Sequence, residues 1–410
     1  MRKNKKIEYF QRLNLNWKCS SLKLTGGYKG GVDFTPPFHL QGPDQTMRLV
    51  SFSAKGYRSL RSVRFDLGQV TVFVGENGAG KSNLYRALQL VKAAAEGNLS
   101  TEVVREGGMQ SAMWSGNRRK HESARIILEA DFEDERLASR LSYRVEAGLP
   151  PPVSGAFPFE PQIKEEQLNL DTGRRPVDLM DRRGPAVFAR DGEGRRMEHP
   201  ARLLTSESGL AVLGQSGHYP EIGDLSAQIR GWRFYHGFRS DRDAPVRQPS
   251  IAATAAMLDE DGGNLASVFA TLAHIRQDTV DLDRLVADAL EGAKLVVPYP
   301  EETATFGLNF PAFPPRTFRP GELSDGQIRL LALAGALLSY RLPPLIALNE
   351  PEASLHPDMI PSLARMIAQA SERSQIWVVT HSAALASAIA EQCGARPIRV
   401  SKQDGETVLE

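Results

Sequence analysis

The sequence contains little cysteine, almost no net charge and no long apolar run. Cys19 and Cys393 are the two cysteines among 410 residues, too few for a disulfide framework or a four-cysteine zinc site. A disulfide-stapled scaffold is therefore excluded, and a reducing, cytoplasmic compartment is favoured. Lys and Arg total 50 and Asp and Glu total 49, so the formal net charge of +1 indicates neither a nucleic acid nor an acidic lipid as partner.

No apolar segment is long enough to cross a membrane. The nearest candidate, residues 330–348, is interrupted by Arg341 and by the pair Pro343-Pro344, whereas a membrane span needs about 20 predominantly apolar residues. This pattern is typical of a buried helix, a turn and a buried strand, and we expect no membrane partner. The length of the chain predicts two or three lobes with cores of their own.

Charge and patterning divide the chain into four expected parts. Residues 1–46 carry eight basic and three acidic side chains, and we expect a basic, flexible extension, with a phosphate-contacting arm as the alternative. Residues 47–135 and 321–410 contain strongly patterned strands and helices. Residues 136–320 are less regular and are expected to form an insertion and a helical lobe.

Residues 75–82 read Gly-Glu-Asn-Gly-Ala-Gly-Lys-Ser and match the phosphate-binding pattern G-x-x-x-x-G-K-[ST]. A buried apolar strand at 70–74 precedes them and a helical pattern follows, as this motif requires. Backbone N–H groups of such a loop surround a phosphate, while the lysine reaches the β and γ phosphates and the serine ligates Mg²⁺. The alternative is a glycine-rich turn with a chance lysine, which the surrounding strand and helix disfavour. The expected nucleotide ligands are Gly75, Asn77, Gly78, Ala79, Gly80, Lys81, Ser82 and Asn83.

Two further apolar strands end in polar residues. Residues 345–348 lead to Glu350, and residues 376–379 lead to His381. Ligands of α/β sheets bind at the carboxyl ends of the strands. A carboxylate there can polarise a water for attack on a γ-phosphate, with Glu350 as first candidate and Glu352 as second. A lone histidine is more often structural, but the position of His381 favours a donor to the γ-phosphate.

The segment Leu-Ser-Asp-Gly-Gln at 323–327 precedes a long apolar helical pattern. Ser324 can accept hydrogen bonds from backbone N–H groups and Asp325 complements the helix dipole, as in an ordinary helix cap. The same geometry can bind a phosphate. Spacing alone does not decide between the two.

Taken together, the segments GENGAGKS, LSDGQ, LNEPEASLHP and VVTHS resemble the ABC-type ATPase heads of the branch that includes RecF, SMC and OLD-family proteins. Residues 258–266 look similar to a segment of bacterial AAA family predicted ATPases of RecF-like type. The resemblance implies an α/β P-loop NTPase with a mixed central sheet flanked by helices. A large helical and strand insertion would separate the glycine motif from LSDGQ.

In that family two heads pair, and the LSDGQ motif of one head meets the ATP bound by the other. The resemblance therefore implies an Mg²⁺-dependent ATPase that acts as a homodimer, with residues 354–357 at the interface. Glu350 would be the general base and His381 the switch histidine. The residues that would contact ATP from the second copy are Ser324, Gly326 and Gln327.

The sequence departs from the family pattern in three places, and the first is Asp325 of LSDGQ, where transporters usually have glycine, a substitution that is common in this branch. Asn349 stands where many relatives carry the aspartate that holds Mg²⁺. The amide of Asn349 and the hydroxyl of Ser82 would then hold the metal with one negative charge less, and ATP turnover would be slower. No Q-loop, the glutamine-containing loop of the family, is clear in the sequence, and Gln110 is a weak candidate for its glutamine. Arg58 lies in a segment similar to the early strand turn of SMC-like heads and would contact the nucleotide.

Evidence for nucleic acid binding in the sequence itself is weak. Residues 231–239 interleave aromatic and basic side chains, which suits base stacking, but their alternation favours a half-buried strand. Residues 171–202 are rich in arginine, but six acidic residues lie among them, and we expect a solvated loop. A role with DNA therefore rests on the resemblance.

The leading hypothesis is a cytoplasmic Mg²⁺-dependent ATPase whose paired heads open and close with ATP, coupled to DNA repair, DNA maintenance or antiphage defence. It would act through DNA or through a separate effector protein. The alternative is a nucleotide-gated binding module whose hydrolysis is very slow.

Overall fold

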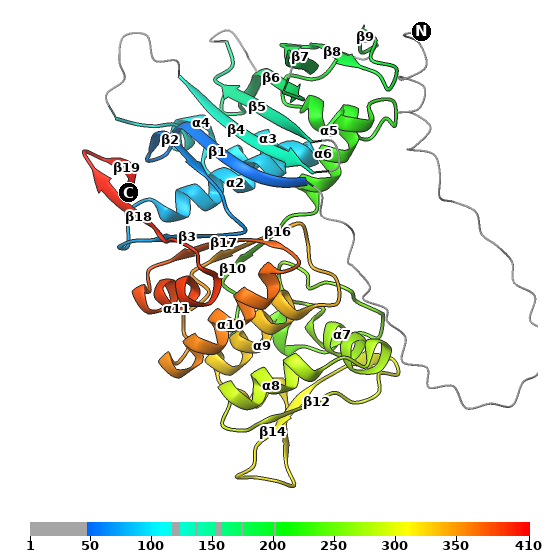
Figure 1. Ribbon diagram of the computed structural model, residues 1–410, viewed down its shortest axis with the longest axis vertical. Coiled ribbons are helices and arrows are strands. Elements are labelled where there is room, and N and C mark those ends of the chain that lie inside the picture. Colours follow the sequence, from blue (N-terminus) through cyan, green and yellow to red (C-terminus); the bar gives the residue numbers. More distant parts are fainter. Residues whose placement is uncertain (1–46, 117–123, 136–137, 152–156, 174, 201) are drawn as a thin grey trace, which may run out of the picture. The chain divides into compact units, whose positions relative to one another are not determined.

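Figure 1 presents the computed structural model, which describes residues 47–116, 124–135, 138–151, 157–173, 175–200 and 202–410. The expected extension at 1–46 lies outside the described residues. All described residues belong to one unit of the chain, Gly42–Glu410. None of its helices, within these ranges, is long and apolar enough to span a membrane.

The sheet that carries the glycine motif has six strands in the order β10-β16-β17-β3-β18-β19. The first five strands run parallel, and β19 pairs antiparallel with β18. Apolar runs without alternation are typical of such strands, because both faces are covered. The strands are β3 (Val70–Val74), β10 (Arg233–His236), β16 (Leu345–Asn349), β17 (Gln375–Thr380), β18 (Ile398–Gln403) and β19 (Glu406–Leu409).

A second, antiparallel sheet has eight strands in the order β2-β1-β4-β5-β6-β7-β8-β9. Successive residues of β4 alternate between more and less buried positions, as in a sheet with one face on a core. The boundary expected between 135 and 136 falls between β4 and β5, which pair with each other. The strands are β1 (Met47–Tyr57), β2 (Leu60–Asp66), β4 (Arg125–Asp134), β5 (Ser139–Gly148), β6 (Gln162–Asp171), β7 (Val177–Arg183), β8 (Ala186–Arg190) and β9 (Arg196–Glu198).

The helices divide between the two faces of the six-stranded sheet. Phe73 and Trp377 of that sheet belong to a core shared with the eight-stranded sheet and α2, whereas Val72 and Val378 belong to a core shared with α7 to α11. Figure 1 shows α2 between the two sheets. The helices are α2 (Lys81–Glu96), α3 (Leu99–Arg105), α4 (Gly108–Ala112), α5 (Gly209–Gly214), α6 (Pro220–Arg230), α7 (Leu265–Ala270), α8 (Val280–Ala289), α9 (Asp325–Leu338), α10 (Ile360–Ser371) and α11 (Ala383–Cys393).

Short elements complete the part of the chain that carries α7 and α8. A π-helical turn continues α7, and two small antiparallel sheets pair β11 with β13 and β12 with β14 and β15. These elements are β11 (Ser250–Ile251), β12 (Lys294–Val296), β13 (Thr303–Ala304), β14 (Gly307–Asn309), β15 (Thr317–Phe318), η2 (Pro245–Arg247), η3 (Thr271–Arg276), η4 (Pro320–Glu322) and η5 (Pro357–Met359).

Residues 171–202 are not the solvated loop that we expected, because the strands β7, β8 and β9 run through them. Arg182 is fully buried, and its guanidinium lies 3.5 Å from the buried carboxylate of Glu166. Most other charged side chains of these strands lie on exposed positions, which an antiparallel sheet with one solvated face tolerates. The high density of charged residues was therefore not a sign of a loop at 171–202.

The strand predicted within 231–239 is confirmed as β10, but it is buried on both faces. Phe234 belongs to the core shared with the eight-stranded sheet and Tyr235 to the other core. The Phe234 N–H donates to a carboxylate oxygen of Glu260 at 3.0 Å, which closes the outer edge of the sheet. The aromatic rings are therefore packing residues and do not form a surface for stacking bases.

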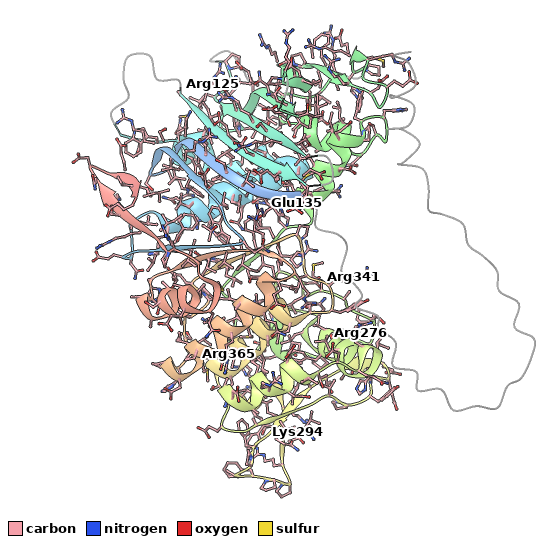
Figure 2. All side chains as sticks on the ribbon, viewed as in Figure 1. Arg125, Glu135, Arg276, Lys294, Arg341 and Arg365 are labelled. Carbon is pink, nitrogen blue, oxygen red and sulfur yellow. The ribbon has the colours of Figure 1, made fainter. Side chains whose placement is uncertain are left out.

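Arginines labelled in Figure 2 make contacts within the chain. Arg125 donates to Glu146 at 2.6 Å and to Glu165 at 3.1 Å, and Arg365 lies 3.1 Å from Asp288. The guanidinium of Arg276 lies 4.2 Å from the centre of the Tyr340 ring. Arg125 and Arg365 are therefore paired with carboxylates of the same chain, and Arg276 with an aromatic ring.

Candidate active site

The parallel order of β16, β17 and β3 brings three distant segments to one edge of the sheet. Asn349 is opposite Val379, and Thr380 is opposite Val74, in the strand register. The residues that follow these strands therefore begin side by side, as the sequence predicted from their carboxyl ends. The pKa of Lys81 gives the same picture: burial lowers it, while the carboxylates of Glu350 and Glu352 act in the opposite direction.

The glycine loop, residues 75–80, links β3 to α2. Gly78 and Gly80 have left-handed backbones with φ of +81° and +102°, which glycine adopts without steric cost. The Lys81 ammonium is buried and donates to the carbonyl oxygens of Gly75 and Glu76, at 2.7 Å each. No acidic residue lies in the first turn of α2, so its positive dipole end is free to attract an anion.

Asn349 ends β16 beside His236, which ends the neighbouring strand β10. The Asn349 side-chain nitrogen Nδ2 lies 2.5 Å from Nδ1 of His236, and its Oδ1 is buried with no hydrogen-bond partner. One face of the amide is therefore fixed by the imidazole while its oxygen stays unsatisfied. Sequence reasoning missed His236, although a polar residue at the end of a buried strand was the available signal.

Glu350 follows β16 in a left-handed backbone, with φ of +49°. Its N–H donates to the Val379 carbonyl at 2.7 Å, which fixes the turn against β17. Its side chain is 34% exposed, and its carboxylate lies 4.0 Å from Nδ1 of His381. A non-glycine residue in this conformation is costly and is most often retained at functional sites.

Glu352 has a different environment, because its side chain is only 5% exposed. One carboxylate oxygen accepts hydrogen bonds from the Thr380 hydroxyl at 2.5 Å and from the backbone N–H groups of His381 and Ser382 at 3.1 and 3.2 Å. The same oxygen lies 3.1 Å from Nδ1 of His381. Glu352 therefore holds the end of β17 and the imidazole of His381, which argues against it as the second general-base candidate.

The LSDGQ motif begins α9 as a capping box. Ser324 accepts from the Gln327 N–H at 3.3 Å, and the Gln327 side chain accepts from the Ser324 N–H at 2.9 Å. A Cβ on Gly326 would lie 2.9 Å from the carbonyl oxygen of Ser354, so the motif packs closely against the expected interface segment 354–357. In the described part of the chain, no hydrogen bond or ion pair joins residues 324–327 to the glycine loop.

Arg58 and Gln110 are the two remaining candidates from the sequence. Arg58 directly precedes Ser59, whose hydroxyl accepts a hydrogen bond from Asn83 in the first turn of α2. The Arg58 guanidinium donates to the Glu106 carboxylate at 2.8 and 3.0 Å and to the Tyr57 hydroxyl at 3.2 Å, so its donors are engaged within the chain. Gln110 lies on α4, after the helix that carries Glu106 at its end. Gln110 therefore does not follow a strand of the six-stranded sheet.

Two family models match the chain. Residues 47–182 match one described as "AAA ATPase domain", and residues 230–387 match one described as "AAA domain, putative AbiEii toxin, Type IV TA system". The first range includes the glycine loop, and the second includes Glu350 and His381. No curated protein matches the sequence significantly.

Solved structures of SMC heads resemble the chain in fold. The "SmcHead bound to the C-winged helix domain of ScpA" has a TM-score of 0.54 and 17% identity, over 88% of this chain and 97% of that chain. A Smc head domain derived from Pyrococcus furiosus, with an extended coiled coil and bound to the C-terminal domain of ScpA, has a TM-score of 0.51 and 15% identity, over 89% and 96%. The chain is therefore a P-loop ATPase with the ABC-type fold of an SMC head.

Proposed function

We propose that the protein hydrolyses ATP with Mg²⁺ at the edge where β3, β16 and β17 end, and that two copies close over the nucleotide. The observation that carries the proposal is the convergence of Lys81, Glu350 and His381 at this edge through adjacent parallel strands. Lys81 binds the β and γ phosphates together with the N–H groups of the glycine loop. Glu350 accepts a proton from the attacking water, and His381 donates to the γ-phosphate.

The residues at this edge fit Mg²⁺. Among the described residues there is no group of three or more His, Cys, Asp or Glu that could hold a metal ion, but Mg²⁺ usually takes only one or two protein oxygens and completes its shell with phosphates and water. The unpartnered Oδ1 of Asn349 and the hydroxyl of Ser82 are oxygens of this kind. When bound, Mg²⁺ supplies positive charge to the β and γ phosphates.

Pairing of two copies is proposed from the LSDGQ motif. Three of its residues lie at the N-terminus of α9, where Ser324 is exposed and Gly326 and Gln327 are part-buried. Gly326 contacts segment 354–357, and among the described residues no hydrogen bond joins this N-terminus to the glycine loop of its own chain. Such a terminus attracts a phosphate, and the glycine loop of a second copy would supply one. In this arrangement ATP joins the two copies and its hydrolysis releases them.

Phosphate release by the purified protein tests the proposal. With saturating Mg²⁺ and ATP, Glu350→Gln should lower turnover about 100-fold or more, because a general base contributes 10²–10⁴-fold, while ATP binding persists. Glu391→Gln, which changes an exposed carboxylate on α11, is the matched control and should not alter turnover. Equal turnover of Glu350→Gln and the unchanged protein would refute the assignment of the base.

A second candidate function is favoured by Asn349. An amide in place of a carboxylate holds Mg²⁺ with one charge less, so hydrolysis would be slow and ATP would act mainly to close the dimer as a binding module. ATP-dependent dimers without measurable phosphate release support this candidate. Phosphate release that Glu350→Gln abolishes supports the enzyme.

The partner and place of action belong to the proposal as well. We propose a cytoplasmic role in DNA repair, DNA maintenance or antiphage defence, exerted through DNA or through a separate effector protein. Two SMC heads of similar fold were solved with parts of ScpA bound, which supports a protein partner for a head of this kind. Copurification with and without Glu350→Gln, which prolongs the ATP-bound state, would identify such a partner.

A further inference from the structure

We propose that Ser59 and Thr407, which lie 348 positions apart in the chain, are positioning residues for the glycine loop. Their hydroxyl groups hold the Ala79 carbonyl on the outer side of the loop, so that the next N–H, that of Gly80, faces the phosphate. This inference rests on the proposed function of the loop. Sequence patterns did not reveal either residue.

The hairpin of β18 and β19 touches the glycine loop at both of its ends. A Cβ on Gly75 would lie 2.2 Å from the carbonyl oxygen of Val400, and a Cβ on Gly80 would lie 1.9 Å from the hydroxyl oxygen of Thr407. Real Cβ atoms do not approach other heavy atoms so closely. Both glycines are therefore required for contact with the hairpin, in addition to any role beside a phosphate.

A chain of hydrogen bonds runs from α2 through both hydroxyls to the loop. The Asn83 side-chain Nδ2 donates to the Ser59 hydroxyl at 2.7 Å, and the Ser59 and Thr407 hydroxyl oxygens are 2.7 Å apart. Thr407 donates to the Ala79 carbonyl at 3.1 Å. Because Asn83 and Ala79 fix the two ends, Ser59 must donate to Thr407, and each hydroxyl gives one hydrogen bond and takes one.

The hydrogen bond from Thr407 to the Ala79 carbonyl also fixes the direction of the Gly80 N–H. The bond between Ala79 and Gly80 is trans, as are all described peptide bonds, and in a trans peptide the C=O and the following N–H point in opposite directions. Fixing the Ala79 carbonyl against Thr407 therefore turns the Gly80 N–H away from the hairpin. Since backbone N–H groups bind the phosphate in a loop of this type, the hydroxyl pair prepares the loop for ATP.

The hairpin is fixed well enough to act as a support. The Thr407 N–H donates to the Ser59 carbonyl at 2.9 Å, and an ion pair of 2.6 Å joins Arg61 to Glu406. Thr407 is 4% exposed, so water does not compete for its hydroxyl. In Figure 1 the hairpin lies beside β2 at the edge that carries the start of α2.

Thr407→Val tests the inference, because it keeps the shape of the side chain and removes the hydroxyl. The dissociation constant of a fluorescent ATP analogue should rise about tenfold, which corresponds to about 1.4 kcal/mol, because the Ala79 carbonyl loses its hydrogen bond. Ser59→Ala should weaken binding similarly, and the double variant should be no weaker than either single one. Thr407→Ser should restore the affinity of the unchanged protein.

Controls separate this inference from the proposed function and from misfolding. Ser401→Ala removes a hydroxyl of the same hairpin that bonds Glu410 and should leave the affinity for ATP unchanged.

The variant Lys81→Ala should bind ATP poorly. If it binds ATP normally, or if the unchanged protein binds no ATP, the proposed function fails and this inference fails with it. Normal affinity of Thr407→Val beside weak binding by Lys81→Ala overturns the inference alone. If Thr407→Val lowers the melting temperature, Thr407→Ser and Ser59→Ala decide the outcome.

Discussion

Glu350 and Glu352 are two positions apart, but their surroundings assign them different tasks. Glu350 is part-exposed at the sheet edge, whereas Glu352 is buried with three donors on one oxygen. One oxygen of this carboxylate is occupied by these donors and the other is buried, so Glu352 is less accessible to a water than Glu350. It is well placed to hold the His381 backbone and imidazole.

Replacement of Glu352 should destabilise the protein. Glu352→Ala leaves the Thr380 hydroxyl and the His381 N–H without an acceptor, whereas the Ser382 N–H still donates to the Thr380 hydroxyl, and we expect the free energy of unfolding to fall by about 2–4 kcal/mol. Glu352→Gln keeps one acceptor oxygen and should lose clearly less. Urea unfolding measures both changes, and an alanine variant as stable as the glutamine variant would show that the carboxylate is not the anchor of β17.

At the residue scale, the sequence predicted the groups that belong to a continuous motif. Lys81 and Ser82 follow from the glycine pattern, and Glu350 and His381 follow from apolar runs that end on them. Sequence reasoning missed His236 although this residue ends a buried strand, and it could not find Ser59 and Thr407, because each acts through a contact with a distant segment. Contacts of this kind leave no local pattern in the chain.

At the scale of elements, α9 is held at its N-terminus by one buried arginine. The Arg247 guanidinium donates to the carbonyl oxygens of Ser240, Pro320 and Leu323 and to the carboxylate of Asp325. It therefore joins the segment after β10, the turn before α9 and the LSDGQ motif.

We expect Arg247→Ala to loosen this junction. The side chain is 6% exposed, and its loss leaves several carbonyl groups unpaired, so the free energy of unfolding should fall by roughly 3 kcal/mol. Arg239→Ala removes an arginine of the same segment that pairs with Asp241 at the surface and should not shift the urea midpoint. Two equal midpoints would mean that Arg247 does not anchor α9.

The strands of the six-stranded sheet that lead to the candidate site were predictable, whereas its strands β18 and β19 and part of the eight-stranded sheet were not. Strands β3, β16 and β17 are continuous apolar runs, and the strand and helix expected around the glycine loop are confirmed as β3 and α2. The strands β7 to β9 carry charged residues on a solvated face, and the burial of Arg182 depends on Glu166. Periodicity is weak when one face of a strand tolerates nearly any residue.

For the whole molecule, pairing of two copies predicts complementation between inactive variants. Lys81→Ala should inactivate the glycine loop, and Ser324→Arg should block the LSDGQ motif of the other copy. A mixed dimer would then contain one intact site, so an equal mixture should regain about a quarter of the normal turnover, because half of the dimers are mixed and each has one of two sites.

Phosphate release by the mixture, compared with each variant alone, measures this effect. Each variant by itself should be inactive. A mixture as inactive as its components would show that one chain completes its own site. The subunits must be mixed before ATP is added, since closed dimers would not exchange.

The hairpin behind the glycine loop also affects the order of events during synthesis. Thr407 lies 328 positions after Ala79, and translation at about 5–20 residues per second places its appearance on the order of 20 to 60 s after that of the loop. A nascent chain on the ribosome would therefore carry the loop without its support for that time. Chains that end before the hairpin should therefore bind ATP more weakly than chains that contain it.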